Sequence, residues 1–151
     1  MKSRTLISIL ILVFAVMVIS EGFATEKKVT KRDYRFFSGT WINEDYDSHR
    51  FMAKFVLRPD GTWDAYNRLS DTGKSFIGYY KIVEKWIDSE GSIWYKTHVW
   101  WGSMVEGHPS EYKLDKFSES GKVWEYLGLT GDFPAELDEG NFHYHIYYRQ
   151  E

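Results

Sequence analysis

The sequence predicts an all-β protein, a single eight-stranded antiparallel up-and-down β-barrel preceded by a signal peptide. Segments of strand length, with alternating apolar and polar residues, are separated by turn signals rich in Gly, Asp, Pro and Ser. Aromatic residues make up 19% of the chain, which favours strands over helices. No segment carries the 3.6-residue apolar period of a helix. Eight strands in a meander protect their edges by closing into a barrel; the alternative is an open β-sandwich.

Residues 1–24 have the pattern of a secretory signal peptide. Lys2 and Arg4 form a positively charged start, and the apolar run Leu6–Ile19 follows. That run has about 14 residues, whereas a membrane-spanning helix needs roughly 20. Gly22 and Ala24 place small residues before a cleavage site after Ala24. We therefore expect export to the periplasm or the medium; an uncleaved N-terminal anchor is the alternative.

The composition of the mature chain excludes several classes of function. Cleavage after Ala24 leaves 151 − 24 = 127 residues, enough for one domain. The leader carries a net charge of +1, so the mature charge is −3 − 1 = −4, which argues against nucleic-acid binding. The absence of cysteine excludes disulfides, thiolate metal sites and a cysteine nucleophile. We expect no cofactor, no bound metal and no membrane span after signal cleavage.

The first predicted elements follow a charged segment, 25–33, which we expect to be a flexible lead-in to a domain over 34–151. The first strand is Gly39–Asn43, in which the glycine lets backbone pass close to the indole of Trp41. The second is Phe51–Leu57, with Phe55 and its alternate neighbours on one face. A Pro-Asp-Gly turn leads to the third strand, Thr62–Tyr66.

Five further strands complete the predicted barrel, and turns or loops connect them. Strand alternation turns Tyr80 of the fourth and Tyr95, Thr97 and Trp101 of the fifth to the face that we assign to the interior. In the last strand we place Tyr144 inward and both His143 and His145 outward. The predicted ranges are Ser75–Ile87, Ser92–Trp101, Ser110–Ser118, Lys122–Leu127 and Asn141–Tyr148.

The two ends of the predicted barrel sequence resemble the calycin superfamily. Gly39-Thr40-Trp41 in the first strand and Tyr147-Tyr148-Arg149 in the last are similar to motifs of small lipocalin-like domains of exported bacterial proteins. The resemblance implies that Trp41 lies across the closed barrel end and that Arg149 packs over its indole as a cation–π pair. Gly39, Trp41 and Arg149 would then form a structural end plug. It also implies that a small apolar molecule binds inside the barrel.

Two branches of the superfamily match less well. Cytosolic fatty-acid-binding proteins have two helices between the first two strands, whereas nine residues separate Trp41 from Phe51 here. Avidins open with G-x-W-x-N, as does Gly39–Asn43, but aromatic residues occupy most positions where avidins carry the Ser and Thr that bind biotin. The similarity to avidins therefore ends with the first strand.

Aromatic and hydroxyl side chains on the predicted inner face form the candidate ligand-binding site. Tyrosine combines a large apolar body with one hydroxyl that needs a partner when buried, as in many small-molecule sites. The alternative is that these side chains fill the interior and bond to one another. The candidate ligand-binding residues are Tyr66, Tyr80, Tyr95, Thr97, Trp101, Tyr112 and Tyr144.

Other polar residues give weaker signals. His143 and His145 could begin a metal site only with a third ligand, and we place them with His98 on the outer face. Glu84 and Glu125 lie among aromatic residues, and one of them could point inward with a raised pKa. Acidic residues cluster in two loops, at 44–47 and 136–139, which we interpret as solvated.

We find no nucleophile elbow, catalytic triad or phosphate-binding loop, so we expect a binding protein and not an enzyme. The expected ligand is a small apolar or aromatic molecule. The alternative is an interaction or structural domain with a filled core that acts through surface aromatics such as Tyr79, Trp94 and Trp100.

The leader pattern predicts a mature N-terminus at Thr25. The intact mass of the protein recovered from the periplasm or the medium should correspond to residues 25–151, because signal peptidase cleaves after the small residue Ala24. Recovery of the full-length chain in the membrane fraction would contradict cleavage and support an uncleaved anchor.

Overall fold

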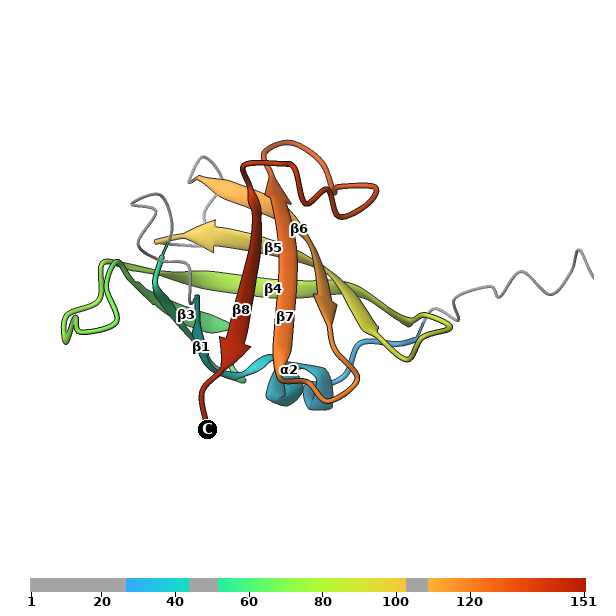
Figure 1. Cartoon of the computed structure of the whole chain (residues 1–151), viewed down its shortest axis with the longest axis horizontal. Helices are drawn as coiled ribbons and strands as arrows, with labels where there is room; N and C mark the ends of the chain where they lie inside the picture. The colour runs from blue at the N-terminus through green and yellow to red at the C-terminus, as the bar shows by residue number, and fades with distance from the viewer. Residues whose placement is uncertain (1–26, 44–51, 103–108) are drawn as a thin grey trace, which may run out of the picture.

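The computed structural model describes residues 27–43, 52–102 and 109–151. Within them, eight antiparallel strands form a closed barrel in which each strand pairs with its neighbours in the sequence and β8 pairs with β1 (Figure 1). This confirms the predicted all-β, eight-stranded, up-and-down barrel. The strands are β1 Gly39–Ile42, β2 Lys54–Leu57, β3 Thr62–Tyr66, β4 Phe76–Ile87, β5 Ile93–Trp101, β6 Ser110–Phe117, β7 Val123–Leu129 and β8 Tyr144–Arg149. The predicted leader, the acidic loop 44–47 and Phe51 lie outside the described residues.

A short helix, α2 (Lys31–Phe37), includes the last three residues of the segment 25–33, for which the sequence predicts no regular structure. Its start is stabilised by Asp33, whose carboxylate accepts hydrogen bonds of 2.8 Å from the backbone N–H and the hydroxyl of Thr30. Asp33 is itself buried and ion-paired with Lys85 of β4. Seven residues are too few for a 3.6-residue period to be recognised in the sequence. Across the described ranges, no helix is both long enough and apolar enough to cross a membrane.

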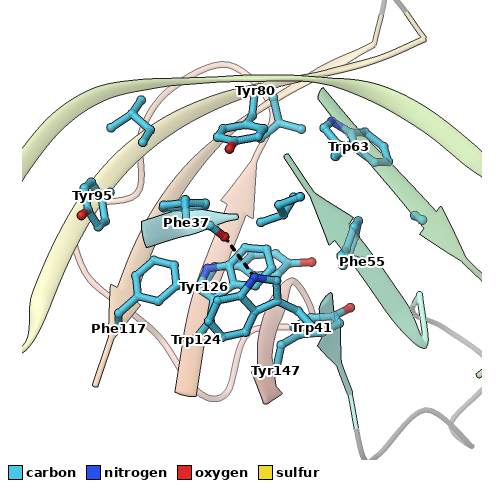
Figure 2. Packing of buried hydrophobic residues seen from close by; sticks show 14 residues of the cluster. Phe37, Trp41, Phe55, Trp63, Tyr80, Tyr95, Phe117, Trp124, Tyr126 and Tyr147 are labelled. Atoms are coloured by element: carbon cyan, nitrogen blue, oxygen red, sulfur yellow. Dashed lines mark hydrogen bonds between the residues drawn. The ribbon is translucent and has the colours of Figure 1, made fainter. Parts of the chain in front are cut away.

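Helix α2 lies across one end of the barrel, which we call the closed end (Figure 1). Its last residue, Phe37, is buried among rings from several strands, with its ring centroid 4.7 Å from Phe117 and 5.3 Å from Tyr95 (Figure 2). Interior positions on the strands alternate with outer ones, so nearly every strand adds a ring to this cluster. The largest fully buried side chains include Trp41, Trp63, Tyr95, Tyr147 and Phe117.

The structure contains the contact between Trp41 and Arg149 that the family resemblance implies. The Trp41 indole is fully buried and its N–H donates to the carbonyl oxygen of Phe37 at 3.1 Å (Figure 2). The two residues are partners in the β1–β8 register, and the guanidinium carbon of Arg149 lies 4.5 Å from the indole centroid. Arg149 also donates to the carbonyl oxygen of Phe36. Gly39 precedes them with a φ of 147°, which favours glycine.

The end plug predicts coupled effects on stability. Trp41→Ala should lower the free energy of unfolding by about 3–5 kcal/mol, because it empties a fully buried ring site. Arg149→Ala should cost less than Trp41→Ala, but more than the ~0.5 kcal/mol typical of a surface substitution. Urea unfolding of both single variants and the double variant measures their coupling. Additive losses would show that the guanidinium and the indole do not stabilise each other.

Candidate functional site

The enclosed interior of the barrel is filled by its own side chains. A cavity of about 20 Å³ lies inside the barrel and is lined by core residues such as Phe37, Trp63 and Tyr80. A volume of that size holds about one water molecule. Among the described residues, this interior cavity has no room for a ligand of several heavy atoms.

Three of the predicted ligand-binding residues do face this interior, but their hydroxyls already have partners in the protein. Tyr80 donates to the carbonyl oxygen of Arg58 at 2.6 Å. Tyr95 donates to the buried carboxylate of Asp33 at 3.1 Å. The hydroxyl of Thr97 donates to the carboxylate of Asp115 at 2.7 Å. These hydroxyls join barrel strands to α2, to a turn and to each other, as in the predicted alternative of a filled core.

Three other predicted residues lie on the outer face, which corrects their inward assignment. Tyr66 packs beside its cross-strand partner Lys54, whose amine lies 4.0 Å from the ring centroid. Tyr112 stacks on His98 with centroids 4.1 Å apart. The hydroxyl of Tyr144 donates to Glu125 at 2.6 Å. None of the three reaches the barrel interior.

The inner and outer faces of β8 are the reverse of those predicted, and this follows from the pairing of β8 with β7. Tyr126 is buried in the core and pairs with His145, and Trp124 pairs with Tyr147, so His145 and Tyr147 share the inner face. Tyr144 consequently points outward. The predicted outward placement of His145 is therefore wrong. Both faces of β8 carry aromatic residues, and its alternation alone does not distinguish inside from outside.

The seventh predicted residue, Trp101, is half-buried at the barrel end opposite α2. It lines the 20 Å³ cavity and also a larger concavity of about 170 Å³, which we call the mouth pocket. Most of the walls are apolar or aromatic, with Glu111 and two histidines as the polar groups. The lining residues are Met52, Phe55, Trp101, Glu111, Tyr126, Gly128, Phe142, His143 and His145.

The inner face of β6 carries charged residues that the sequence analysis missed. Glu111, Lys113 and Asp115 alternate along it, and Lys113 and Asp115 are buried. Lys113 Nζ lies 3.8 Å from Glu111 Oε2 and 3.9 Å from the ring centroid of Tyr126. A signal for this orientation exists in the sequence. The tight turn at 118–122 pairs Phe117 with the core residue Trp124, which forces every second residue of β6 inward.

The buried charges have shifted pKa values. Burial raises the pKa of Asp115 to about 6, against the charge of Lys113 and hydrogen bonds from Thr97 and Trp124. Burial lowers the pKa of Lys113, although Glu111 and Asp115 oppose that shift. Burial, with the charges of Lys113 and His143, lowers the pKa of His145 to about 3. His145 is therefore neutral at physiological pH.

The remaining polar candidates lie on the outside. Glu84 forms an ion pair with Lys96 at 2.8 Å, and Glu125 accepts the bond from Tyr144, so neither points into the barrel. His98 stacks against Trp100 and Tyr112 on the outer face, as predicted for that histidine. Among the described residues, no three His, Cys, Asp or Glu side chains are grouped so that they could hold a metal ion.

Comparisons with protein-family models, with curated proteins and with solved structures found no match to this chain. The site is therefore interpreted from its own geometry.

The raised pKa of Asp115 predicts a pH effect on stability. The folded state binds the Asp115 proton more tightly than the unfolded state, where the pKa is about 3.9. The contribution of Asp115 to stability is thus greatest below that value and falls as pH rises through about 6. Asp115→Asn removes this dependence, so the stability of wild type relative to the variant should fall between pH 4 and 7 in urea unfolding.

Asp33→Asn is the matched control, with the opposite sign. Burial opposes ionisation of Asp33, but bonds from Lys85 and Thr30 outweigh it and lower its pKa. Its contribution is present above the unfolded pKa and is lost as pH falls through the folded one. Parallel pH profiles for wild type and Asp115→Asn would contradict the raised pKa.

Proposed function

We propose that this chain is an exported, lipocalin-like binding protein that holds one small apolar or aromatic molecule in the mouth pocket. The observation that carries the proposal is the contrast between the barrel interior and the end opposite α2. The interior keeps about 20 Å³ of space, whereas the end opposite α2 has a concavity of about 170 Å³. A cavity of ~150 Å³ accommodates a molecule the size of benzene, so a single ring fits the mouth pocket.

The chemistry of the walls suits such a ligand. Phe55, Trp101 and Tyr126 offer rings, and Met52 offers a flexible apolar side chain that adapts to the shape of a guest. The neutral imidazole of His145 and the carboxylate of Glu111 supply a few polar points within an otherwise apolar wall. Small-molecule sites commonly combine these features to give affinity and orientation.

The export and the family assignment rest on separate observations. Lys2, Arg4 and the apolar run after them support secretion to the periplasm or the medium. The G-x-W motif at Gly39–Trp41 and the contact of Trp41 with Arg149 support a lipocalin-like member of the calycin superfamily. The polar groups of the mouth do not form a triad or a metal site in the described chain, and binding without turnover is the simpler function.

A second function, interaction through outer aromatics, is favoured by a groove on the outside of β4 and β5. Trp86 and Trp94 stack there with centroids 5.8 Å apart, and Lys116 lies 5.5 Å from the Trp94 ring centroid. The groove measures about 500 Å³ and runs between Trp86 and the segment around Phe133. A partner with exposed apolar groups would fit this surface.

Titration with benzyl alcohol tests the mouth pocket. At about 0.5 kcal/mol per heavy atom, eight heavy atoms give a Kd of about 1 mM. Binding should change tryptophan fluorescence, because Trp101 lines the pocket. Trp101→Phe should abolish most of that change. Trp100→Phe is the matched control, since this neighbouring indole lies on the outer face against His98.

The outcome separates the two functions. Chemical-shift changes at Met52, Trp101 and Tyr126 on adding benzyl alcohol would support the mouth pocket. Changes confined to Trp86, Trp94 and Phe133 would contradict it and favour the outer groove. An unchanged spectrum up to ten times the expected Kd would exclude single-ring ligands from the mouth.

A further inference from the structure

A buried lysine lies behind three of the side chains that line the mouth pocket. Lys113 is 4% exposed, although lysine is almost never fully buried unless it is paired. Its cross-strand partner is Gly128, where an added Cβ would lie 3.4 Å from Lys113 Cγ and 3.5 Å from Cε. The nearest atom to such a Cβ would be Glu111 Oε2, at 3.0 Å, so the glycine makes room for the carboxylate that lies beside the amine, while the lysine stem would be in ordinary van der Waals contact.

The amine lies between the two cavities. It lines the 20 Å³ cavity, and three side chains that contact Nζ are also walls of the mouth pocket; the buried carboxylate of Asp115 acts on its charge as well. Tyr126 and Phe55 have ring centroids 3.9 Å and 5.6 Å from Nζ, and the Glu111 carboxylate is 3.8 Å away. A ring held in the mouth pocket therefore contacts the same three side chains that surround the amine.

We propose that Lys113 is a reactive amine that forms a reversible imine with a small aromatic aldehyde held in the mouth pocket. This inference rests on the proposed function, because the aldehyde occupies the same pocket. A lysine desolvated in an apolar pocket is activated as a nucleophile, and the lowered pKa of Lys113 agrees with that environment.

The reaction balances without a cofactor or an oxidant. The neutral amine attacks the carbonyl carbon, and the carbonyl oxygen takes up a proton to give a carbinolamine. Loss of the second nitrogen proton and of the hydroxyl group as water then leaves the C=N bond. Glu111 is placed to take the proton that the ammonium group must lose before attack, and neutral His145 adds no competing positive charge to the pocket.

The other lysines form an internal comparison. Lys116 follows on the outer face of the same strand, partly exposed, with its amine over Trp94. It has the same side-chain type as Lys113 and lies on the same strand, but it does not line the interior cavity. Lys116 should therefore react far less than Lys113 under the same conditions.

Reductive trapping with benzaldehyde and cyanoborohydride tests the proposal on the mature wild-type protein. Intact mass should show one benzyl group, and peptide mapping should place it on Lys113 with at least about 10-fold more modification than on Lys116. Lys113→Arg should lose the single adduct, and Lys116→Arg should keep it. The comparison within the wild-type chain does not depend on whether Lys113→Arg folds. Equal labelling of Lys113 and the exposed lysines would overturn the proposal.

Benzyl alcohol distinguishes this inference from the proposed function, because it fits the same pocket and cannot form an imine. If the alcohol binds and Lys113 is not selectively trapped, the binding function stands and the imine is wrong. If Lys113 is trapped and the alcohol does not bind, reactive-amine chemistry stands and reversible binding of neutral rings is wrong. If neither occurs, both proposals fail.

Discussion

The contact between Phe37 and Trp41 is the interaction on which the rest of the barrel depends. A helix of seven residues is not stable by itself in water, so α2 is held by what it buries. Its last ring enters the centre of the core, and its last carbonyl groups accept hydrogen bonds from the indole of Trp41 and the guanidinium of Arg149. The strands form the barrel wall. The helix contributes a ring to the core and the carbonyl acceptors that close one end.

Closing that end with rings decides where a ligand can bind. Phe37, Tyr95, Phe117 and Trp124 occupy the volume that a carrier with a deep pocket would leave empty. Burying their surface favours folding by about 25 cal/mol per Å². In the proposed function, small-molecule binding is therefore placed at the mouth pocket, and the rings of the filled interior contribute to stability.

The sequence predicted the architecture because strand alternation and turn residues are local signals. Strand β3 begins and ends as predicted, and the other strands differ from their described bounds by a few residues. The inner faces of β6 and β8 were harder to assign. In β6 the apolar residue Leu114 suggests one face, whereas pairing with β7 selects the face of Lys113 and Asp115. Register across a hairpin is a non-local constraint, and it overrides the apolar count of a single strand.

Several residues of the candidate site were assigned to the wrong face because the inner and outer faces of single strands are hard to distinguish from sequence. Tyr112 and Tyr144 were assigned inward as aromatics, and His145 was assigned outward as a polar residue. The structure reverses all three, because aromatic side chains cover the outer face as well. The local signal for α2 was present in Thr30 and Asp33, which match the spacing of a capping box, but the helix that follows is too short to show a period.

The lysine beside the mouth pocket has different surroundings from the lysines on the outer face. Outer lysines also lie over rings, as Lys54 does over Tyr66, but water solvates those cations and the contacts contribute little beyond packing. Lys113 is enclosed by Tyr126, Phe55 and Glu111, and it shares the inner face of β6 with the buried carboxylate of Asp115. Removing one member of a buried charge pair leaves the other uncompensated, so the pairing by itself accounts for a lysine at this position. The same enclosure provides the desolvation that the proposed nucleophilic role requires.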